Sequence, residues 1–335
     1  MKSTVVTAPG KAVLSGEYAV LAGAPAVSMA VDRRARVSVS SLAEGATSTV
    51  AAPGYASGEW RFETGPDGRV TWLDRLPPGG LPVVEATWQR YPGDAPLSIV
   101  VDTRDFHDPA SNRKFGLGSS AAATTALLTA LSVHCRDAVP TWAECRDVHR
   151  ALQGQRGSGV DVATSFHGGL LRFSMADEAP RTLRWPGGLE YRLLWSGSPA
   201  DTVAQLAKYD GRDPHEQSSG LLADAAAAVA DAWPDADTDA LLEAFARYTE
   251  MLRQFDVDHG LGIFDAGHGA LSARATGAGL VYKPCGAGGG DIGIVLGTDS
   301  AAIEAFCEQA ATEGFSKLDM HLDSHGVRVM PGETR

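Results

Sequence analysis

The sequence predicts an α/β protein with two domains, and three observations support this. Patterns typical of strands and of helices alternate along the chain. Its 335 residues can bury a substantial core and exceed the common size of one domain. The composition changes near residue 175, because residues 176–186 are largely polar and contain two prolines. We therefore expect domains over residues 1–175 and 176–335.

The N-terminal half contains both element types. Residues 35–40 alternate apolar and polar side chains, as a half-buried strand does, and residues 97–101 are a short β-prone run. Between them, residues 51–96 are rich in glycine, proline and tryptophan, which predicts hairpins and loops. Residues 119–134 predict a buried helix because alanine and leucine dominate there. Residues 168–173 predict a turn that leads into a strand.

The C-terminal half predicts a strand followed by two helices. The strand covers residues 191–195, and the helices cover residues 221–233 and 239–255, separated by Pro234. Large apolar residues of the second helix share one face at helical spacing: Leu241, Leu242, Phe245, Tyr248, Leu252 and Phe255. A single apolar face of this kind predicts packing against the core.

Composition excludes several functional classes. The chain has 29 basic and 41 acidic residues, a net charge of -12, which argues against a general binder of nucleic acid or of anionic membranes. It has no apolar run of about 18 residues, and its start lacks the apolar core of a signal peptide. The four cysteines form no CxxC pair, so neither a disulfide framework nor a zinc site is favoured. We expect a cytoplasmic protein with reduced thiols.

The most informative segment is residues 113–123, with the sequence RKFGLGSSAAA. Here a glycine-rich turn joins directly to a helix start. Glycine amides can approach an anion closely, the helix dipole favours negative charge, and a serine is expected to cap the helix. Arg113 and Lys114 add positive charge. The segment therefore predicts a phosphate-binding loop.

Two other interpretations of the glycine patterns are weaker. Residues 116–121 also fit a relaxed GxGxxA dinucleotide fingerprint, but the polar residues 103–113 separate them from the preceding strand, unlike a compact βαβ turn. A second segment, residues 8–20, contains Gly10-Lys11. It is not a Walker A loop, because Ala12 follows the lysine and the GxxxxGK spacing is absent. Taken alone, this segment also fits a surface turn with a solvated lysine.

A third glycine-rich segment, residues 283–296, has glycines at four of the five positions 286–290 and then a β-prone run. This suits a backbone that approaches another group closely before entering a strand, although a flexible hairpin would have the same composition. The order of the three segments resembles the signature motifs of the GHMP kinase family. That family includes galactokinase, homoserine kinase, mevalonate kinase and phosphomevalonate kinase, and the resemblance runs from residue 8 to about residue 330.

The resemblance implies a specific two-domain α/β fold. The N-terminal domain would resemble the second domain of ribosomal protein S5, and the C-terminal domain would be ferredoxin-like. ATP and substrate would bind in the cleft between them. Within the family, four segments are similar to the phosphomevalonate kinases: residues 102–120, 149–163, 195–200 and 286–296. The implied activity is ATP-dependent phosphorylation of 5-phosphomevalonate in isoprenoid precursor synthesis.

The resemblance also implies roles for individual residues. Lys11 would stabilise charge on the transferred phosphoryl group, and Asp161 would orient the attacking oxygen and accept its proton or lower its pKa. ATP phosphates would lie on the loop Gly116, Leu117, Gly118, Ser119, Ser120 and Ala121. Mg²⁺ is implied, with Ser119 or Ser120 as ligand. Substrate contacts would come from His149, Arg150, Gln153, Ser158, Ser198, Gly288 and Gly289.

One position departs from the family pattern. Mevalonate kinases that resemble this chain carry a magnesium-binding glutamate eleven residues before the aspartate that matches Asp161, where this chain has Arg150. A guanidinium cannot ligate Mg²⁺ but suits a phosphorylated substrate, which favours the phosphomevalonate kinases. Glu17 is expected to hold the first motif by pairing with a neighbouring group rather than to act in catalysis.

Alternatives remain open at this point. Another GHMP enzyme, similar to mevalonate kinase or to diphosphomevalonate decarboxylase, would have the same nucleotide site and a different acceptor. A nucleotide-binding regulator without turnover would also keep the fold. Asp161 could cap a turn, and His149 could be a structural helix residue. The expected partners are ATP and a phosphorylated mevalonate-type acid, and the chain is expected to be a monomer or homodimer.

Overall fold

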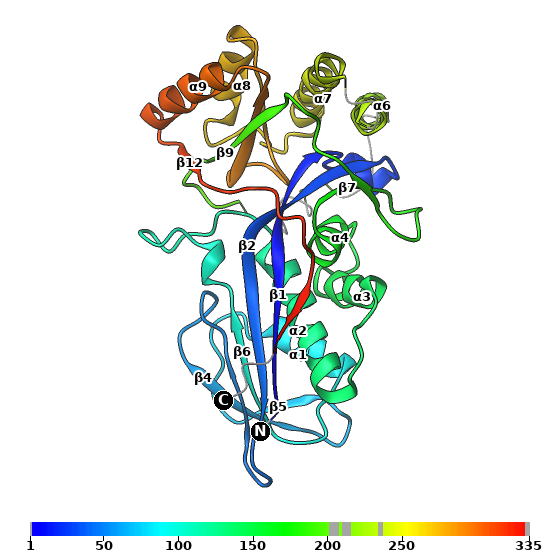
Figure 1. Cartoon of the computed structure of the whole chain (residues 1–335), viewed down its shortest axis with the longest axis vertical. Helices are drawn as coiled ribbons and strands as arrows, with labels where there is room; N and C mark the ends of the chain where they lie inside the picture. Colours follow the sequence, from blue (N-terminus) through cyan, green and yellow to red (C-terminus); the bar gives the residue numbers. More distant parts are fainter. Residues whose placement is uncertain (1, 201–207, 210–215, 234–236, 332–335) are drawn as a thin grey trace.

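The chain folds into two sheets with helices packed against them (Figure 1). This computed structural model describes residues 2–200, 208–209, 216–233 and 237–331. Within those ranges, one sheet has nine strands and the other has four. No helix in the same ranges is both long and apolar enough to cross a membrane.

The larger sheet has the order β13-β1-β2-β6-β3-β4-β5, and β7 and β8 extend it beyond β2. Its strands are β1 (Ser3–Ser15), β2 (Ala26–Ser41), β3 (Ser48–Ala51), β4 (Glu59–Thr64), β5 (Val70–Trp72), β6 (Leu97–Asp102), β7 (Leu170–Phe173), β8 (Arg181–Leu183) and β13 (Arg328–Met330). The long pair β1 and β2 forms its axis, connected through the 3₁₀ turn η1 (Ala19–Ala22). Of the pairs formed, β3 with β6 is parallel and the others are antiparallel.

Helices cover one face of this sheet, on the right of β1 in Figure 1. They are α1 (Pro82–Arg90), α2 (Ser119–Arg136), α3 (Trp142–Leu152) and α4 (Val160–His167). The alanine- and leucine-rich body of α2 is buried almost throughout, as its composition predicts. A short 3₁₀ turn, η2 (Arg104–Phe106), leads from β6 toward the glycine loop that precedes α2.

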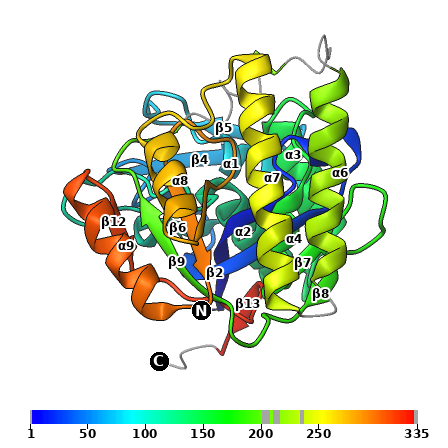
Figure 2. The same cartoon turned by 90° about the horizontal axis from the view of Figure 1, so that it is seen from above.

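The smaller sheet has the antiparallel order β10-β11-β9-β12. Its strands are β9 (Glu190–Trp195), β10 (Val281–Pro284), β11 (Ile292–Gly297) and β12 (Ser316–Leu318). The helices α8 (His268–Gly277) and α9 (Ser300–Thr312) pack on it, and the helices α6 (Glu216–Ala232) and α7 (Thr238–His259) lie side by side next to them (Figure 2). The first and third of these strands in chain order are the central ones, which is the ferredoxin-like arrangement that was expected.

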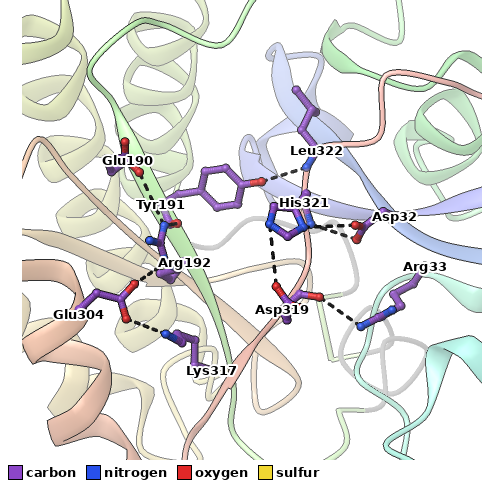
Figure 3. A network of polar contacts seen from close by, with 10 residues as sticks. All are labelled: Asp32, Arg33, Glu190, Tyr191, Arg192, Glu304, Lys317, Asp319, His321 and Leu322. Atoms are coloured by element: carbon purple, nitrogen blue, oxygen red, sulfur yellow. Dashed lines mark hydrogen bonds and ion pairs between the residues drawn. The ribbon is translucent and has the colours of Figure 1, made fainter. Parts of the chain in front are cut away.

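The chain returns from the smaller sheet to the larger one after β12. Figure 3 shows the contacts along this return: the Leu322 amide donates to the Tyr191 hydroxyl at 2.9 Å, and the His321 amide donates to Asp32 Oδ1 at 3.0 Å. Arg33 donates to the Asp319 carbonyl at 3.1 Å. Strand β13 then pairs with β1. The two ends of the chain therefore share one sheet.

The domain boundary predicted near residue 175 falls between β7 and β8, both of which belong to the larger sheet. The chain enters the smaller sheet only at β9. The sheet to which each of these strands belongs depends on pairing between distant strands, which cannot be predicted from local composition. The division of the chain at this residue stays a prediction.

Most of the predicted elements are confirmed. The strands expected over residues 35–40, 97–101, 168–173 and 191–195 lie in β2, β6, β7 and β9, and the expected helices are α2, α6 and α7. The prediction of hairpins and loops for residues 51–96 was wrong at α1. Pro82 is the first residue of this helix, a position at which proline is tolerated. Pro234 lies outside the described residues. The apolar face of α7 is core, with Leu242 only partly buried.

Candidate active site

The glycine loop before α2 has an open helix end. Gly116 and Gly118 have φ angles of 87° and 74°, in the left-handed region that favours glycine. Gly118 is the N-cap of α2, and a glycine has no side chain that could accept a hydrogen bond from the first helical amides. The predicted serine cap was therefore wrong, because Ser119 is already the first helical residue. The uncapped amides leave a site suited to an anion.

Lys11 is held directly against this loop. Its backbone amide donates to the Leu117 carbonyl at 2.8 Å, which joins β1 to the loop. The register of β1 against β2 shifts between Pro9 and Gly10, and such bulges change the direction of the side chains that follow. A Cβ placed on Gly118 would lie 3.1 Å from Lys11 Cε, so the aliphatic stem of the lysine runs over the loop glycine.

Asp161 lies at the start of another helix. It occupies the first turn of α4, whose N-cap is Gly159 with φ 90°. Its Oδ1 accepts a hydrogen bond from the Val162 amide at 2.9 Å. Its Oδ2 faces Nδ1 of His149, a residue in the last turn of α3, at 3.8 Å. Three helices therefore bring predicted residues together, because His149 Nε2 also lies 3.3 Å from Ser120 Oγ at the start of α2.

Two cavities meet at these residues. The loop cavity, about 680 Å³, is lined by every residue from Gly116 to Ala121. The strand cavity, about 110 Å³, lies along the end of β1 and is lined by Ser158 and Gly286 among others. Both cavities include Lys11, Gln153 and Asp161 in their walls. The two cavities therefore share the two residues predicted to act in catalysis.

Four predicted substrate residues lie outside these walls. The Arg150 guanidinium donates to the Gln155 carbonyl at 3.4 Å. Ser198 is exposed, and its carbonyl accepts from the Asp291 amide at 2.7 Å. Gly289 donates to the Ile263 carbonyl at 3.0 Å, and a Cβ on the adjacent Gly288 would lie 2.6 Å from Ile263 Cα. Their roles toward substrate stay predictions.

Sequence reasoning gave no role to Asp291, which lies in the wall of the loop cavity. Its Oδ1 accepts from the Ala200 amide at 3.0 Å, and its carboxyl group occupies the space that a Cβ on Gly116 would need. Burial raises the pKa of this carboxyl above its usual range, while Lys11 and Lys114 act in the opposite direction. The signal in the sequence is its place directly after the third glycine run.

A buried ion pair lies beside the strand cavity. Lys283 Nζ lies 2.5 Å from Glu17 Oε1, and both side chains are almost completely buried. Glu17 Oε2 accepts from the Tyr248 hydroxyl at 2.6 Å. Burial, followed by the charge of Glu17, raises the pKa of Tyr248 well above its usual value. The pairing expected for Glu17 exists, and its partner comes from the smaller sheet.

Comparisons with known proteins identify related kinases. The family described as "GHMP kinases N terminal domain" matches residues 83–169. The phosphomevalonate kinase of Streptomyces sp. (strain CL190) is 32% identical over 88% of this chain and 90% of its own length. The mevalonate kinase of Methanothermobacter thermautotrophicus is 33% identical over 64% of each chain.

A solved structure shows the same fold. It is the Streptococcus pneumoniae phosphomevalonate kinase in complex with phosphomevalonate and AMPPNP, with a TM-score of 0.77 and 16% identity. The match covers 96% of this chain and 100% of that one. From the Streptomyces relative, which matches nearly end to end, and from the three glycine-rich motifs, we conclude that this chain belongs to the GHMP kinase family and is a phosphotransferase.

Proposed function

We propose that this enzyme transfers the γ-phosphoryl group of ATP to 5-phosphomevalonate and releases 5-diphosphomevalonate and ADP. One observation carries the proposal: the cavity with the open helix end and the cavity along β1 share Lys11 and Asp161. The donor would lie in the loop cavity and the acceptor in the strand cavity. The Streptomyces relative, named phosphomevalonate kinase, supports this acceptor.

The loop cavity has the charges that a nucleotide needs. The free amides at the start of α2 would hold the phosphates, and Arg113 and Lys114 in the same wall would offset their charge. A third cavity of about 240 Å³ adjoins Ser119 and Ser120 and is lined mainly by apolar groups, including Leu81 and Val83. This space suits the flat base of the nucleotide.

Mg²⁺ fits the oxygen donors of this site. The described residues include no group of three or more His, Cys, Asp or Glu side chains that could hold a metal. Mg²⁺ commonly binds through one or two protein oxygens together with substrate phosphates, and the Ser119 and Ser120 hydroxyls and the Asp161 carboxylate supply such oxygens. When bound, the ion would neutralise charge on the donor phosphates.

Positioning of the substrates contributes more to the mechanism than a strong base does. An oxygen of the acceptor phosphate forms a bond to the γ-phosphorus, while the bond from that phosphorus to the oxygen bridging to ADP breaks. The second pKa of a phosphate monoester is about 6, so the attacking oxygen is already largely ionised near neutral pH. Asp161 therefore orients the acceptor rather than acting as a strong base. Lys11 neutralises charge on the transferred group as the bonds change.

The proposal places the enzyme in the cytoplasm. All four cysteines are free thiols, and Cys145, Cys285 and Cys307 are buried. Free buried thiols are typical of a reducing compartment.

A coupled ADP-release assay tests the function. Mevalonate, 5-phosphomevalonate, 5-diphosphomevalonate, homoserine and several sugars would be offered as acceptors. We expect turnover with 5-phosphomevalonate. Lys11→Ala should lower kcat by about 10²–10³-fold, as loss of a charge-stabilising group does, and Asp161→Ala should lower it strongly as well. The surface variant Lys317→Ala is the matched control, because that lysine pairs with Glu304 on the C-terminal half.

Three results would contradict the proposal or the roles that it assigns. Turnover with mevalonate and none with 5-phosphomevalonate would identify the other acceptor class. ATP binding with no transfer to any acceptor would indicate a regulator. Full activity in both the Lys11 and Asp161 variants would show that the assigned roles are wrong, even with the substrate right.

A further inference from the structure

The side chain of His149 is almost completely buried where three helices meet. The residue lies in the last turn of α3, is only 1% exposed and is part of the wall of the loop cavity. Its two nitrogens face groups from two other helices. These groups are the hydroxyl of Ser120 in the first turn of α2 and the carboxylate of Asp161 in the first turn of α4.

The two contacts are unequal. His149 Nε2 lies 3.3 Å from Ser120 Oγ, within hydrogen-bond distance. Nδ1 is buried and has no hydrogen-bond partner among the residues that the structure describes, and Asp161 Oδ2 lies 3.8 Å away. A buried polar atom without a partner is unfavourable, and catalytic hydrogen bonds are often long until substrates bind. The other oxygen of Asp161 is already engaged by the Val162 amide, so Oδ2 is the one available to His149.

The chemistry of the three groups assigns their hydrogens. Carboxylate oxygens accept hydrogen bonds, so a hydrogen on Nδ1 suits the contact with Asp161 Oδ2. In that tautomer of the ring Nε2 is an acceptor, and Ser120 donates its hydroxyl hydrogen to it. This leaves the lone pairs of Ser120 Oγ available to the loop cavity, whose wall this serine helps to form. It also places a ring N–H opposite Asp161 Oδ2, 3.8 Å away.

We propose that His149 is a positioning residue that fixes the nucleotide-side serine Ser120 with one nitrogen and the acceptor-side carboxylate Asp161 with the other. The roles of Ser120 and Asp161 in this proposal are those of the proposed function, on which it rests. In this role His149 itself contacts neither substrate. His149 sets the orientation of Ser120 relative to Asp161, and these two residues contact the substrates. The rate of phosphoryl transfer depends strongly on such orientation.

Two conservative variants separate the two contacts. In His149→Asn the side-chain amide reaches only the position of Nδ1 and keeps the contact to Asp161. In His149→Gln it reaches the position of Nε2 and keeps the contact to Ser120. We expect His149→Asn to raise the KM for ATP with kcat within about threefold, and His149→Gln to lower kcat by about 10–100-fold with the KM for ATP unchanged. His149→Ala should show both effects.

His134 provides a matched control. It is also a buried histidine, and it bridges two hydroxyl groups, with Nδ1 3.1 Å from Thr4 Oγ1 and Nε2 3.0 Å from Ser41 Oγ. The same substitutions at His134 should lower the melting temperature and leave kcat and KM unchanged. If the Asn and Gln variants of His149 behave alike, or differ from the His134 variants in melting temperature alone, His149 is a structural residue and the proposal is wrong.

A binding measurement keeps this test independent of the acceptor. If no acceptor in the panel is turned over, the proposed function fails, and the affinity for a non-hydrolysable ATP analogue still tests His149. His149→Asn should weaken that binding and His149→Gln should not. Equal affinities of the two variants would overturn the role of His149.

Discussion

The glycines of the phosphate loop are required by side chains that come from other elements. A Cβ on Gly118 would lie 3.1 Å from Cε of Lys11, on β1, and the carboxyl of Asp291 occupies the space that a Cβ on Gly116 would need. Both glycines also have left-handed φ angles. The loop sequence therefore records two tertiary contacts in addition to its freedom to bind an anion.

At the residue scale we predict that Gly118→Ala impairs catalysis beyond its effect on stability. Alanine at a left-handed φ costs about 1–2 kcal/mol, and its Cβ would also press against Lys11. We expect kcat to fall about tenfold or more, since a misplacement of about 1 Å at a reacting group can cost about 100-fold. Steady-state kinetics and urea unfolding measure the two effects.

Gly188→Ala is the control for backbone strain. Gly188 has φ 84°, and a Cβ there meets no atom of the described part of the chain within 4 Å. The Gly188→Ala variant should lose about as much stability as Gly118→Ala does and keep full activity. Equal kinetics in the two variants would show that the contact with Lys11 is unimportant.

At the element scale, α3 is fixed at its first turn. Thr141 and Glu144 form a capping box, with the Thr141 amide donating to Glu144 Oε2 at 2.9 Å. Glu144 Oε1 accepts from the Tyr91 hydroxyl at 2.6 Å and from Arg90 at 2.5 Å, which joins the end of α1 to α3. His149 lies in the last turn of this helix. The capping box therefore contributes to the placement of the ring between Ser120 and Asp161.

Stability should depend on pH through Glu144. Its hydrogen bond from Tyr91, followed by those from Thr141, lowers the pKa of Glu144 from 4.5 to about 2. Because the folded pKa is the lower one, the stabilising effect is complete above pH 4.5 and is lost as the pH falls toward about 2. Urea unfolding at about pH 5 and about pH 3 should show a smaller loss for Glu144→Gln than for the unmodified chain.

The exposed Glu63 on β4 is the comparison. Its Gln variant should lose as much stability on acidification as the unmodified chain does. A Glu144 variant with the same pH dependence as the Glu63 variant would disprove the assignment.

Elements differ in how far their sequence predicts them. The strand at residues 35–40 and helix α7 follow from local patterns because one face of each is buried, and α2 follows from its alanine- and leucine-rich composition. The Thr-x-x-Glu motif at Thr141 could have indicated α3, since a capping box is a local signal. The partners of Glu144 in α1 could not be predicted, because they depend on packing between helices.

At the scale of the whole molecule, the candidate site depends on contacts between distant parts of the chain. Glu17 and Lys283 are 266 residues apart in sequence and form a fully buried pair. The Gly286 amide also donates to Glu17 at 3.3 Å, and the Tyr18 hydroxyl donates to the Ala287 carbonyl at 2.7 Å. The first and third glycine-rich segments are thereby joined. The motifs predicted the family and the candidate site residues. The contacts between the first and third segments could be found only in the three-dimensional structure.

The buried pair should be costly to break and inexpensive to remove as a whole. Lys283→Met leaves the Glu17 carboxylate buried without its cation, and we expect a loss of about 3–5 kcal/mol in the free energy of unfolding. Adding Glu17→Gln removes the stranded charge and should restore most of that loss. The exposed pair Lys317–Glu304 sets the scale, because Lys317→Met should cost less than about 1 kcal/mol.

The same variants should separate the two cavities kinetically. Glu17 and Gly286 line the strand cavity and are absent from the wall of the loop cavity. In the double variant we therefore expect a higher KM for the acceptor and an unchanged KM for ATP. Urea unfolding of both single variants and the double variant, with steady-state kinetics on each, completes the cycle. A cost for Lys283→Met no larger than that for Lys317→Met, or a double variant less stable than either single one, would refute the role of this pair in joining the two halves.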